Sequence, residues 1–446
     1  MSLQTESSTG TNPAPWHLAG NFAPVHEEID AVDLHVTGEL PPGLDGSFLR
    51  NGPNPHDGPT PHWFFGDGMI HGLHLAGGRA AWYRNRYVRT SSLTGDVRKI
   101  SDTGVRNLVA SKANTHVVRH AGRILALEEA SLPYEVTPDL ETVGVYDFAG
   151  RLDGPMTAHP KVCPITGEMH FFGYDFQAPY LRYHVADASG QLVVTRDVDV
   201  AGPTMMHDFN ISERFVIFMD LPMVFDLEKA IAGTMPYAFE RDYGARLGVL
   251  RRDDPFGVVH WFEIEPCYVF HPLNAHDDGR TITIDVARYA EMWTAAGDDA
   301  VMWRWTIDTV AGTVTEQQLD DRPCEFPRVD DRLIGQPAAR GWVTTTPDAW
   351  DTTNGGSITV YDLANGTGET HQFGAGRVPG EAVFAPADTT PGGPGWLLAY
   401  VFDAARGASD VVVLDPNRPA DEPVATVHLP VRVPYGFHGS WMPTPG

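Results

Sequence analysis

The sequence predicts an all-β fold organised as one β-propeller, and three observations support this expectation. Short alternating or apolar runs, each ended by a Gly, Asp or Asn turn, recur along nearly all of the 446 residues, which is the pattern of β-hairpins. Glycine and proline together make up 81 residues, 45 and 36 respectively. This is enough for many turns and too few for a disordered polymer. The composition does not break along the chain, which favours one large β architecture over a string of small domains.

The turns define the expected elements in chain order. They are residues 73–88 around Gly77-Gly78, 115–127 around Ala121-Gly122, 183–198 around Ser189-Gly190, 281–286, 302–318 around Ala311-Gly312, 358–373 around Asn365-Gly366, 411–414 and 424–429. Helical periodicity is scarce, and its best candidate is the short segment 226–232. No motif repeats at a fixed period, so we expect blades of divergent sequence.

Two segments are expected to form the domain organisation. Residues 1–20 are polar and contain proline, which predicts an N-terminal arm that could be flexible. Residues 21–446 form the propeller domain in this prediction.

The charge balance excludes several classes of partner. The formal net charge is -26, from 58 acidic and 32 basic residues, and such a surface repels nucleic acid and anionic lipid headgroups. The sequence shows neither a signal peptide nor a run of about 18 apolar residues that would predict a transmembrane helix. We therefore expect a cytoplasmic protein, whose oligomeric state the sequence leaves open.

Four histidines stand in separate strand or turn contexts. They are His159, His207, His271 and His438, and the gaps between them are 48, 64 and 167 residues. No single helix or loop can present all four, whereas the innermost strands of propeller blades can bring them to one axis. Any one of the 19 histidines taken alone is more often structural. A site of neutral imidazoles suits iron(II) with open positions for dioxygen, so the set predicts an oxygenase.

A zinc site of cysteine and histidine is the alternative at this stage. Cys163 follows His159 by four residues, and Cys267 precedes His271 by four. Residues four apart on a strand are separated by about 13 Å, at about 3.3 Å per residue, so neither pair can bind one ion. We expect Cys163, Cys267 and Cys324 to be buried apolar side chains.

Three acidic residues in apolar settings could orient the imidazoles. They are Glu129, Glu325 and Glu381, and a metal-binding imidazole usually donates its second N–H to a carboxylate. The alternative for each is a solvated carboxylate at a strand end.

Ordered motifs strengthen these expectations. They occupy residues 49–55, 62–69, 83–90, 113–117, 265–274, 325–329 and 436–439. In this order they resemble the carotenoid cleavage oxygenases, a family that includes apocarotenoid oxygenases, lignostilbene dioxygenases and the retinal-pigment-epithelium isomerase. The resemblance implies a seven-bladed propeller with loops and short helices over the iron-containing face, and Fe(2+) bound by the four histidines.

The resemblance also implies roles for other residues. Glu129, Glu325 and Glu381 match the carboxylates behind the iron ligands, and Thr115 matches a threonine whose methyl group crowds one vacant coordination site. The implied reaction uses dioxygen to split a carbon–carbon double bond into two carbonyl products. We expect Glu128 and Phe437 to contact the substrate.

Two features bear on which alkene is cleaved. Glu128 stands where stilbene-cleaving relatives have a lysine that binds a phenol oxygen, which favours a carotenoid or apocarotenoid over a stilbene, isoeugenol or 4-vinylphenol. A tunnel open at both ends and lined by Phe and Leu would indicate a carotenoid, and a short closed pocket with two polar ends would indicate a phenolic alkene.

Residues 224–246 are expected to form a lid or to touch a membrane, with the lid preferred. A non-catalytic scaffold would need neither a metal nor four axial histidines.

Overall fold

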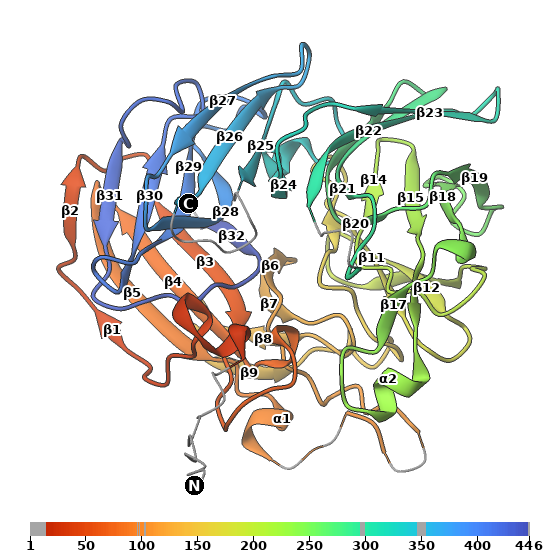
Figure 1. The fold of residues 1–446 in the computed structure, drawn as a ribbon, viewed down its shortest axis with the longest axis horizontal. Coiled ribbons are helices and arrows are strands. Elements are labelled where there is room, and N and C mark those ends of the chain that lie inside the picture. The colour runs from red at the N-terminus through yellow and green to blue at the C-terminus, as the bar shows by residue number, and fades with distance from the viewer. Residues whose placement is uncertain are drawn as a thin grey trace, which may run out of the picture.

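The described residues form seven β-sheets of four or five strands. These sheets are arranged around a central axis (Figure 1). The computed structural model describes residues 15–95, 97, 99–101, 104–294, 299–345 and 354–444. Within these residues, neighbouring strands of each sheet are antiparallel, and most neighbours are also consecutive in the chain. The predicted seven-bladed propeller is confirmed.

The first four blades follow the chain from its N-terminal part. Blade one holds β1 (Asp30–Ala31), β5 (Arg79–Tyr87), β4 (Gly68–Ala76), β3 (Gly46–Pro53) and β32 (Gly439–Pro443). Blade two holds β6 (His116–His120), β7 (Arg123–Leu127), β8 (Tyr134–Val136) and β9 (Thr142–Val145). Blade three holds β10 (Lys161–Val162), β11 (Met169–Tyr174), β12 (Leu181–Ala186) and β13 (Leu192–Asp197). Blade four holds β14 (Phe209–Ile211), β15 (Phe215–Asp220), β18 (Ala245–Arg251) and β19 (His260–Ile264).

The last three blades complete the ring. Blade five holds β20 (Tyr268–Asp277), β21 (Thr281–Tyr289), β22 (Ala300–Asp308) and β23 (Thr313–Gln318). Blade six holds β24 (Glu325–Arg328), β25 (Arg340–Thr345), β26 (Ser357–Asp362) and β27 (Thr367–Gln372). Blade seven holds β28 (Arg377–Pro386), β29 (Gly395–Asp403), β30 (Ala408–Leu414), β31 (Ala425–His428) and β2 (His35–Gly38).

Short elements lie outside the blades. The helices are α1 (Ser91–Thr94) and α2 (Leu227–Ile231), and the second lies between the two strands of a hairpin, β16 (Met223–Phe225) and β17 (Tyr237–Phe239). Five 3-10 turns are described: η1 (Trp16–Leu18), η2 (Gly20–Phe22), η3 (Trp63–Phe65), η4 (Arg241–Tyr243) and η5 (Asp331–Leu333). No helix in the described part of the chain is long and apolar enough to span a membrane.

The hairpins occur where the sequence predicted them. The turn between β4 and β5 contains Gly77 and Gly78, with φ of 56° and 72°, a left-handed conformation that glycine adopts without steric cost. The predicted turns at residues 121–122, 189–190, 311–312 and 365–366 also separate paired strands. The expected short helix is α2.

Both ends of the chain close the ring. β2, near the N-terminus, pairs with β31 on the outer edge of blade seven, and β32, near the C-terminus, pairs with β3 in blade one (Figure 1). Of the expected N-terminal arm, residues 1–14 lie outside the described residues. The Trp16 ring lies 5.1 Å from Phe22, which packs with Trp63 of η3.

Bulges interrupt β20, β24 and β28, each of which is the first strand of its blade. The register shifts between Val269 and Pro272 in β20, between Glu325 and Arg328 in β24, and between Pro379 and Ala382 in β28. A bulge redirects the side chains beside it and is common next to active sites. The bulges contain His271, Phe326 and Glu381, and Phe326 has a left-handed φ of 53°.

Candidate metal centre

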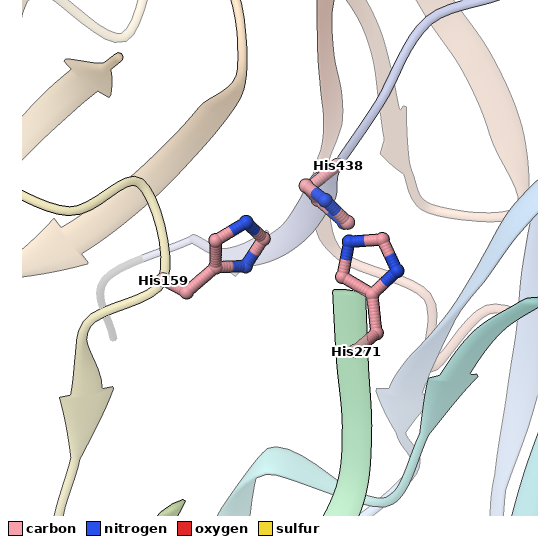
Figure 2. A group of neighbouring side chains, drawn as sticks. All are labelled: His159, His271 and His438. Carbon is pink, nitrogen blue, oxygen red and sulfur yellow. The ribbon is translucent and has the colours of Figure 1, made fainter. Parts of the chain in front are cut away.

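Four histidines from four blades surround the propeller axis. His159 and His207 lie two residues before β10 and β14, His271 lies within β20, and His438 immediately precedes β32. The ring centroid of His159 lies 4.4 Å from that of His207 and 5.3 Å from that of His271. The His438 centroid lies 4.6 Å from both His159 and His271. Figure 2 shows His159, His271 and His438 pointing toward one common space. The structure therefore brings together the four expected side chains.

Unpaired ring nitrogens make this cluster fit a metal ion. His159, His271 and His438 each offer a nitrogen, and the three atoms lie within 4.8 Å of one another. The Nε2 atoms of His159 and His271 are buried without a hydrogen-bond partner. Such an atom costs about 1–3 kcal/mol of stability, and coordination of an ion removes this cost. That these residues bind a metal stays a prediction.

Burial keeps these rings in the form that binds metal. It is the largest cause that lowers the pKa of His159 and His207 well below the ordinary value of 6.5, and neighbouring histidines add to it. Burial also lowers the pKa of His438, although Glu381 acts in the opposite direction. A neutral imidazole is the ligand form of histidine, and these three rings are neutral at pH 7.

Two of the three predicted carboxylates lie directly behind a histidine. Nδ1 of His271 lies 2.5 Å from Oε2 of Glu325, and Nδ1 of His438 lies 2.9 Å from Oε1 of Glu381. Each contact leaves Nε2 of the same ring facing the axis. Burial acts to raise the pKa of Glu325, but His271 outweighs it, and the pKa lies below its ordinary value. A carboxylate here fixes the tautomer and the orientation of the ring.

Glu129 lies differently from the other two carboxylates. Its Oε1 is 3.1 Å from Nε2 of His207 and 3.8 Å from Nε2 of His159, so it stands among the nitrogens that face the axis. Oε1 has no hydrogen-bond partner, and Oε2 accepts one from the hydroxyl of Tyr174 at 2.6 Å. Burial raises the pKa of Glu129 to about 8. With His159 and His207 it forms a second group of three possible ligands, so the expected role behind a histidine stays a prediction.

Sequence analysis did not single out a fourth carboxylate, Asp208. It is buried, and its Oδ2 lies 3.5 Å from Nδ1 of His159. Nζ of Lys161 lies 2.7 Å from its Oδ1. The scarcity of lysine offered a signal, because Lys161 is one of only four lysines in the chain.

Thr115 lies against the His438 segment. Its carbonyl accepts a hydrogen bond from the backbone N–H of His438 at 3.1 Å, and its own N–H donates to Leu127 at 2.9 Å. The Thr115 hydroxyl donates to Asn114 at 3.0 Å. The threonine is thus fixed beside one histidine, and its effect on a vacant coordination site stays a prediction.

Glu128 is held by protein groups. It accepts hydrogen bonds from the ammonium of Lys99 and from the backbone N–H of Lys112. The hydroxyls of Ser111 and Ser131 lie 3.2 and 3.3 Å from its Oε2. Burial lowers the pKa of the Lys99 ammonium to about 7. Substrate contact by Glu128 stays a prediction, and Lys99 places a cation beside it.

Aromatic side chains border the histidines. The Phe270 ring lies 4.8 Å from His207, and Phe64 lies 6.3 Å from Phe270. Phe437, expected to contact substrate, lies 5.4 Å from Phe64. Trp293 lies 6.3 Å from both Phe64 and Phe270. This cluster of Phe64, Phe270, Trp293 and Phe437, called here the aromatic cluster, gives the centre an apolar border.

A small cavity with polar and apolar lining lies beside the segments that follow the histidines in sequence. Its volume is about 60 Å³, and Lys161, Asn210, Asn274 and Arg328 contribute to its lining. These residues come two or three positions after His159, His207, His271 and Glu325 in sequence.

The cysteines take no part in the centre. Cys163, Cys267 and Cys324 are free and buried, as expected, and burial raises the pKa of Cys267 to about 12. Neither metal-compatible group found among the described residues includes a cysteine. The zinc alternative finds no support in this geometry.

Comparison with known proteins places this chain in a family. Residues 22–443 match the family described as retinal pigment epithelial membrane protein. The chain is 36% identical to a carotenoid cleavage oxygenase of Mycobacterium tuberculosis, over 98% of this chain and 99% of that protein. It is 35% identical to carotenoid 9,10(9',10')-cleavage dioxygenase 1 of Arabidopsis thaliana, over 95% of this chain and 89% of that protein.

Solved structures agree with these matches. The lignostilbene dioxygenase of Pseudomonas brassicacearum superposes with a TM-score of 0.86 at 28% identity, over 98% of this chain and all of that one. A cobalt-substituted apocarotenoid oxygenase of Synechocystis superposes with a TM-score of 0.82 at 26% identity, over 94% of this chain and 97% of that one.

Proposed function

The chain belongs to the family of the retinal pigment epithelial membrane protein and the carotenoid cleavage oxygenases, and from this membership we propose that it is an iron(II)-dependent dioxygenase that cleaves a conjugated double bond of a carotenoid or apocarotenoid. Both oxygen atoms of dioxygen enter the products, so that one C=C bond becomes two C=O groups. The relatives it resembles cleave carotenoids or lignostilbenes by their names, and both substrate classes contain the same kind of bond.

We assign the metal to His159, His207, His271 and His438. The buried Nε2 atoms of His159 and His271, which have no hydrogen-bond partner, and the close approach of the four rings support this arrangement. Bound iron(II) would supply the activation of dioxygen that the double bond needs. Glu325 and Glu381 hold the rings of His271 and His438 from behind. Four neutral ligands leave the positive charge of the ion undiminished.

The observation that favours a polyene is the aromatic cluster. Phe270 contacts His207 at one end of it, and Phe437 lies at the other. An apolar chain offers no strong hydrogen-bonding group, so its binding depends on burial, at about 25 cal/mol per Å² removed from water. The cluster supplies apolar surface immediately beside the proposed iron.

A phenolic alkene such as a stilbene is the second candidate, and Lys99 favours it. The Lys99 ammonium is paired with Glu128, near the turn that contains Glu129. A cation in this place can stabilise a phenolate, as the lysine of stilbene-cleaving relatives is expected to do. The similarity to the lignostilbene dioxygenase agrees with this alternative.

The β16–β17 hairpin with α2 is proposed as a lid. The Tyr237 ring lies 6.5 Å from Tyr174, whose hydroxyl donates to Glu129, so strand β17 of the hairpin reaches the edge of the centre. At its tip, Leu227 is 61% and Ile231 78% exposed. These aliphatic side chains also suit contact with a micelle or membrane that delivers an apolar substrate. Location in the cytoplasm stays a prediction.

Product analysis tests the proposed function. Iron-loaded protein is incubated under ¹⁸O-labelled dioxygen separately with an apocarotenoid, resveratrol, isoeugenol and a 4-vinylphenol. The carbonyl products are separated, and their masses are measured by mass spectrometry. We expect two labelled carbonyl fragments from the apocarotenoid at the highest kcat/KM, and none from His271→Ala. Absence of cleavage of every alkene by iron-loaded protein would overturn the proposal.

A further inference from the structure

Asp208 is a buried carboxylate on one edge of the His159 ring. Its side chain is 3% exposed, and its Oδ2 lies 3.5 Å from Nδ1 of His159. On the other edge of the same ring, Nε2 is buried without a hydrogen-bond partner. The carboxylate therefore faces the nitrogen that remains when Nε2 points to the proposed metal.

Lys161 and the backbone fix this carboxylate. Nζ of Lys161 lies 2.7 Å from Oδ1 and 3.0 Å from Oδ2 of Asp208. The N–H of Phe209 also donates to Oδ1, at 2.6 Å. These contacts restrict rotation of the carboxylate. Burial raises the pKa of Asp208, and the adjacent Lys161 ammonium acts in the opposite direction.

The same arrangement occurs behind His438. Nη1 of Arg328 lies 3.1 Å from Oε1 of Glu381, and that oxygen lies 2.9 Å from Nδ1 of His438. Arg328 and Lys161 both line the axial cavity of about 60 Å³. Two series of contacts, each made of a cation, a carboxylate and an imidazole, therefore lead from the same cavity to the proposed centre.

We propose that Asp208 is a positioning residue for His159 and that Lys161 acts through Asp208, as the arrangement of Arg328 and Glu381 behind His438 indicates. The proposal rests on the metal centre assigned above. At 3.5 Å the carboxylate acts chiefly through its charge, because this distance is beyond the usual range of an N–H···O hydrogen bond. An anion facing Nδ1 favours the tautomer with its proton on that atom and leaves the lone pair of Nε2 for the metal.

One consequence concerns the dipeptide His207-Asp208. The first residue faces the centre as a proposed ligand, and the second orients the ligand of the neighbouring blade. Adjacent residues of one segment therefore link blades three and four at the proposed centre.

Cobalt(II) tests the inference without relying on turnover, because its visible absorption depends on ligand geometry. The dissociation constant of cobalt is measured by chelator competition for the full chain and for Asp208→Asn, Lys161→Met and Lys161→Arg, with the absorption spectrum recorded for each. We expect Asp208→Asn to raise the constant about 10-fold or more, the effect of losing an orienting partner, and to change the spectrum. Lys161→Met should act in the same direction, and Lys161→Arg should bind as the wild type does.

A matched control comes from blade five. Asp285 is a buried carboxylate paired with Arg304, whose Nε lies 2.6 Å from Oδ1. Asp285→Asn removes a similar ion pair and should leave the cobalt constant and spectrum unchanged.

The outcomes separate the inference from the function on which it rests. Failure of the wild type to bind one cobalt per chain would overturn the proposed centre itself. Wild-type binding together with an unchanged constant and spectrum in folded Asp208→Asn would overturn the inference alone. Where Asp208→Asn does not fold, equal constants for Lys161→Met and Lys161→Arg would overturn it.

Discussion

Nδ1 of His271 lies 2.5 Å from Oε2 of Glu325 across two neighbouring blades. The same carboxylate accepts hydrogen bonds from the hydroxyl of Tyr289 at 2.8 Å and from the backbone N–H of Phe326 at 2.6 Å. Glu325 is therefore held by His271 of β20, by Tyr289 of β21 and by the backbone of the bulge in its own strand, β24. These protein contacts alone fix its position behind the imidazole.

Replacing Glu325 with glutamine should lower iron affinity about 10- to 100-fold, the usual effect of losing such a partner. The amide keeps the shape of the side chain, but it accepts a weaker hydrogen bond from the imidazole than a carboxylate does. Chelator titration of iron measures the change, and Glu263→Gln, at an exposed position in β19, is the control. Equal affinities for wild type and Glu325→Gln would show that Glu325 has only a structural role.

Alanine at any of the four histidines should remove most of the iron, since each contributes one of the proposed ligands. Cys163→Ala is the matched control, because Cys163 follows His159 by four residues and is buried without joining either metal-compatible group. Elemental analysis after dialysis measures the content. Full iron occupancy in His271→Ala, or its loss in Cys163→Ala, would contradict the assignment.

Glu129→Gln should reduce metal affinity at least as much as Glu325→Gln does. The reason is geometric, because Oε1 of Glu129 lies 3.1 Å from Nε2 of His207 and has no hydrogen-bond partner. This oxygen can therefore bind the ion directly or orient the His207 ring. Both variants are titrated with iron side by side, with melting temperatures as the check on folding. A clearly smaller loss in Glu129→Gln would remove Glu129 from the centre.

Away from the centre, Asp320 should make stability depend on pH. Burial acts to raise its pKa, but Arg322 and Tyr361 outweigh this, and the pKa falls from 3.8 to about 2. A carboxylate with a lowered pKa in the folded state contributes stability above pH 3.8, and this contribution is lost as the pH falls through about 2. The difference in urea stability between wild type and Asp320→Asn should therefore shrink between pH 4 and pH 2. A constant difference across this range would contradict the expectation.

The sequence was informative where turn residues determine local structure. Paired glycines such as Gly77-Gly78 mark hairpins because they adopt left-handed backbone at no cost. The four histidines could be selected because each stands in a separate strand or turn context. Asp208 could not be found in this way. Adjacent residues on a strand face opposite sides, so the neighbour of a ligand is expected to point away from it. His207 and Asp208 lie before β14 begins, and both can face the centre.

Contacts between residues far apart in the sequence could not be predicted either. The bulges in β20 and β28 that contain His271 and Glu381 depend on pairing with the next strand, which the local sequence does not reveal. The ion pair between Lys99 and Glu128 joins two loops 29 residues apart. Only the folded chain shows that the carboxylate at residue 128 has a cation beside it.

This ion pair determines how substrate preference is best tested. A single Glu128→Lys change would place two ammonium groups together and leave the N–H of Lys112 without its acceptor, so we expect it to destabilise the fold. The charge swap Lys99→Glu with Glu128→Lys restores an ion pair and places the lysine where stilbene-cleaving relatives have one. We expect the swapped protein to melt closer to the wild type than the single variant does.

In the swapped protein the ratio of kcat/KM for resveratrol to that for an apocarotenoid should rise. The phenol gains an ammonium partner at residue 128, and an unpaired buried polar group would otherwise cost about 1–3 kcal/mol, which corresponds to roughly 5- to 150-fold in the ratio. The polyene has no group that responds to the change, so its own kcat/KM serves as the internal control. Both rates are measured on one preparation with known iron content. A ratio unchanged from wild type would contradict a role of residue 128 in substrate preference, and the aromatic cluster would then be left as the determinant of preference.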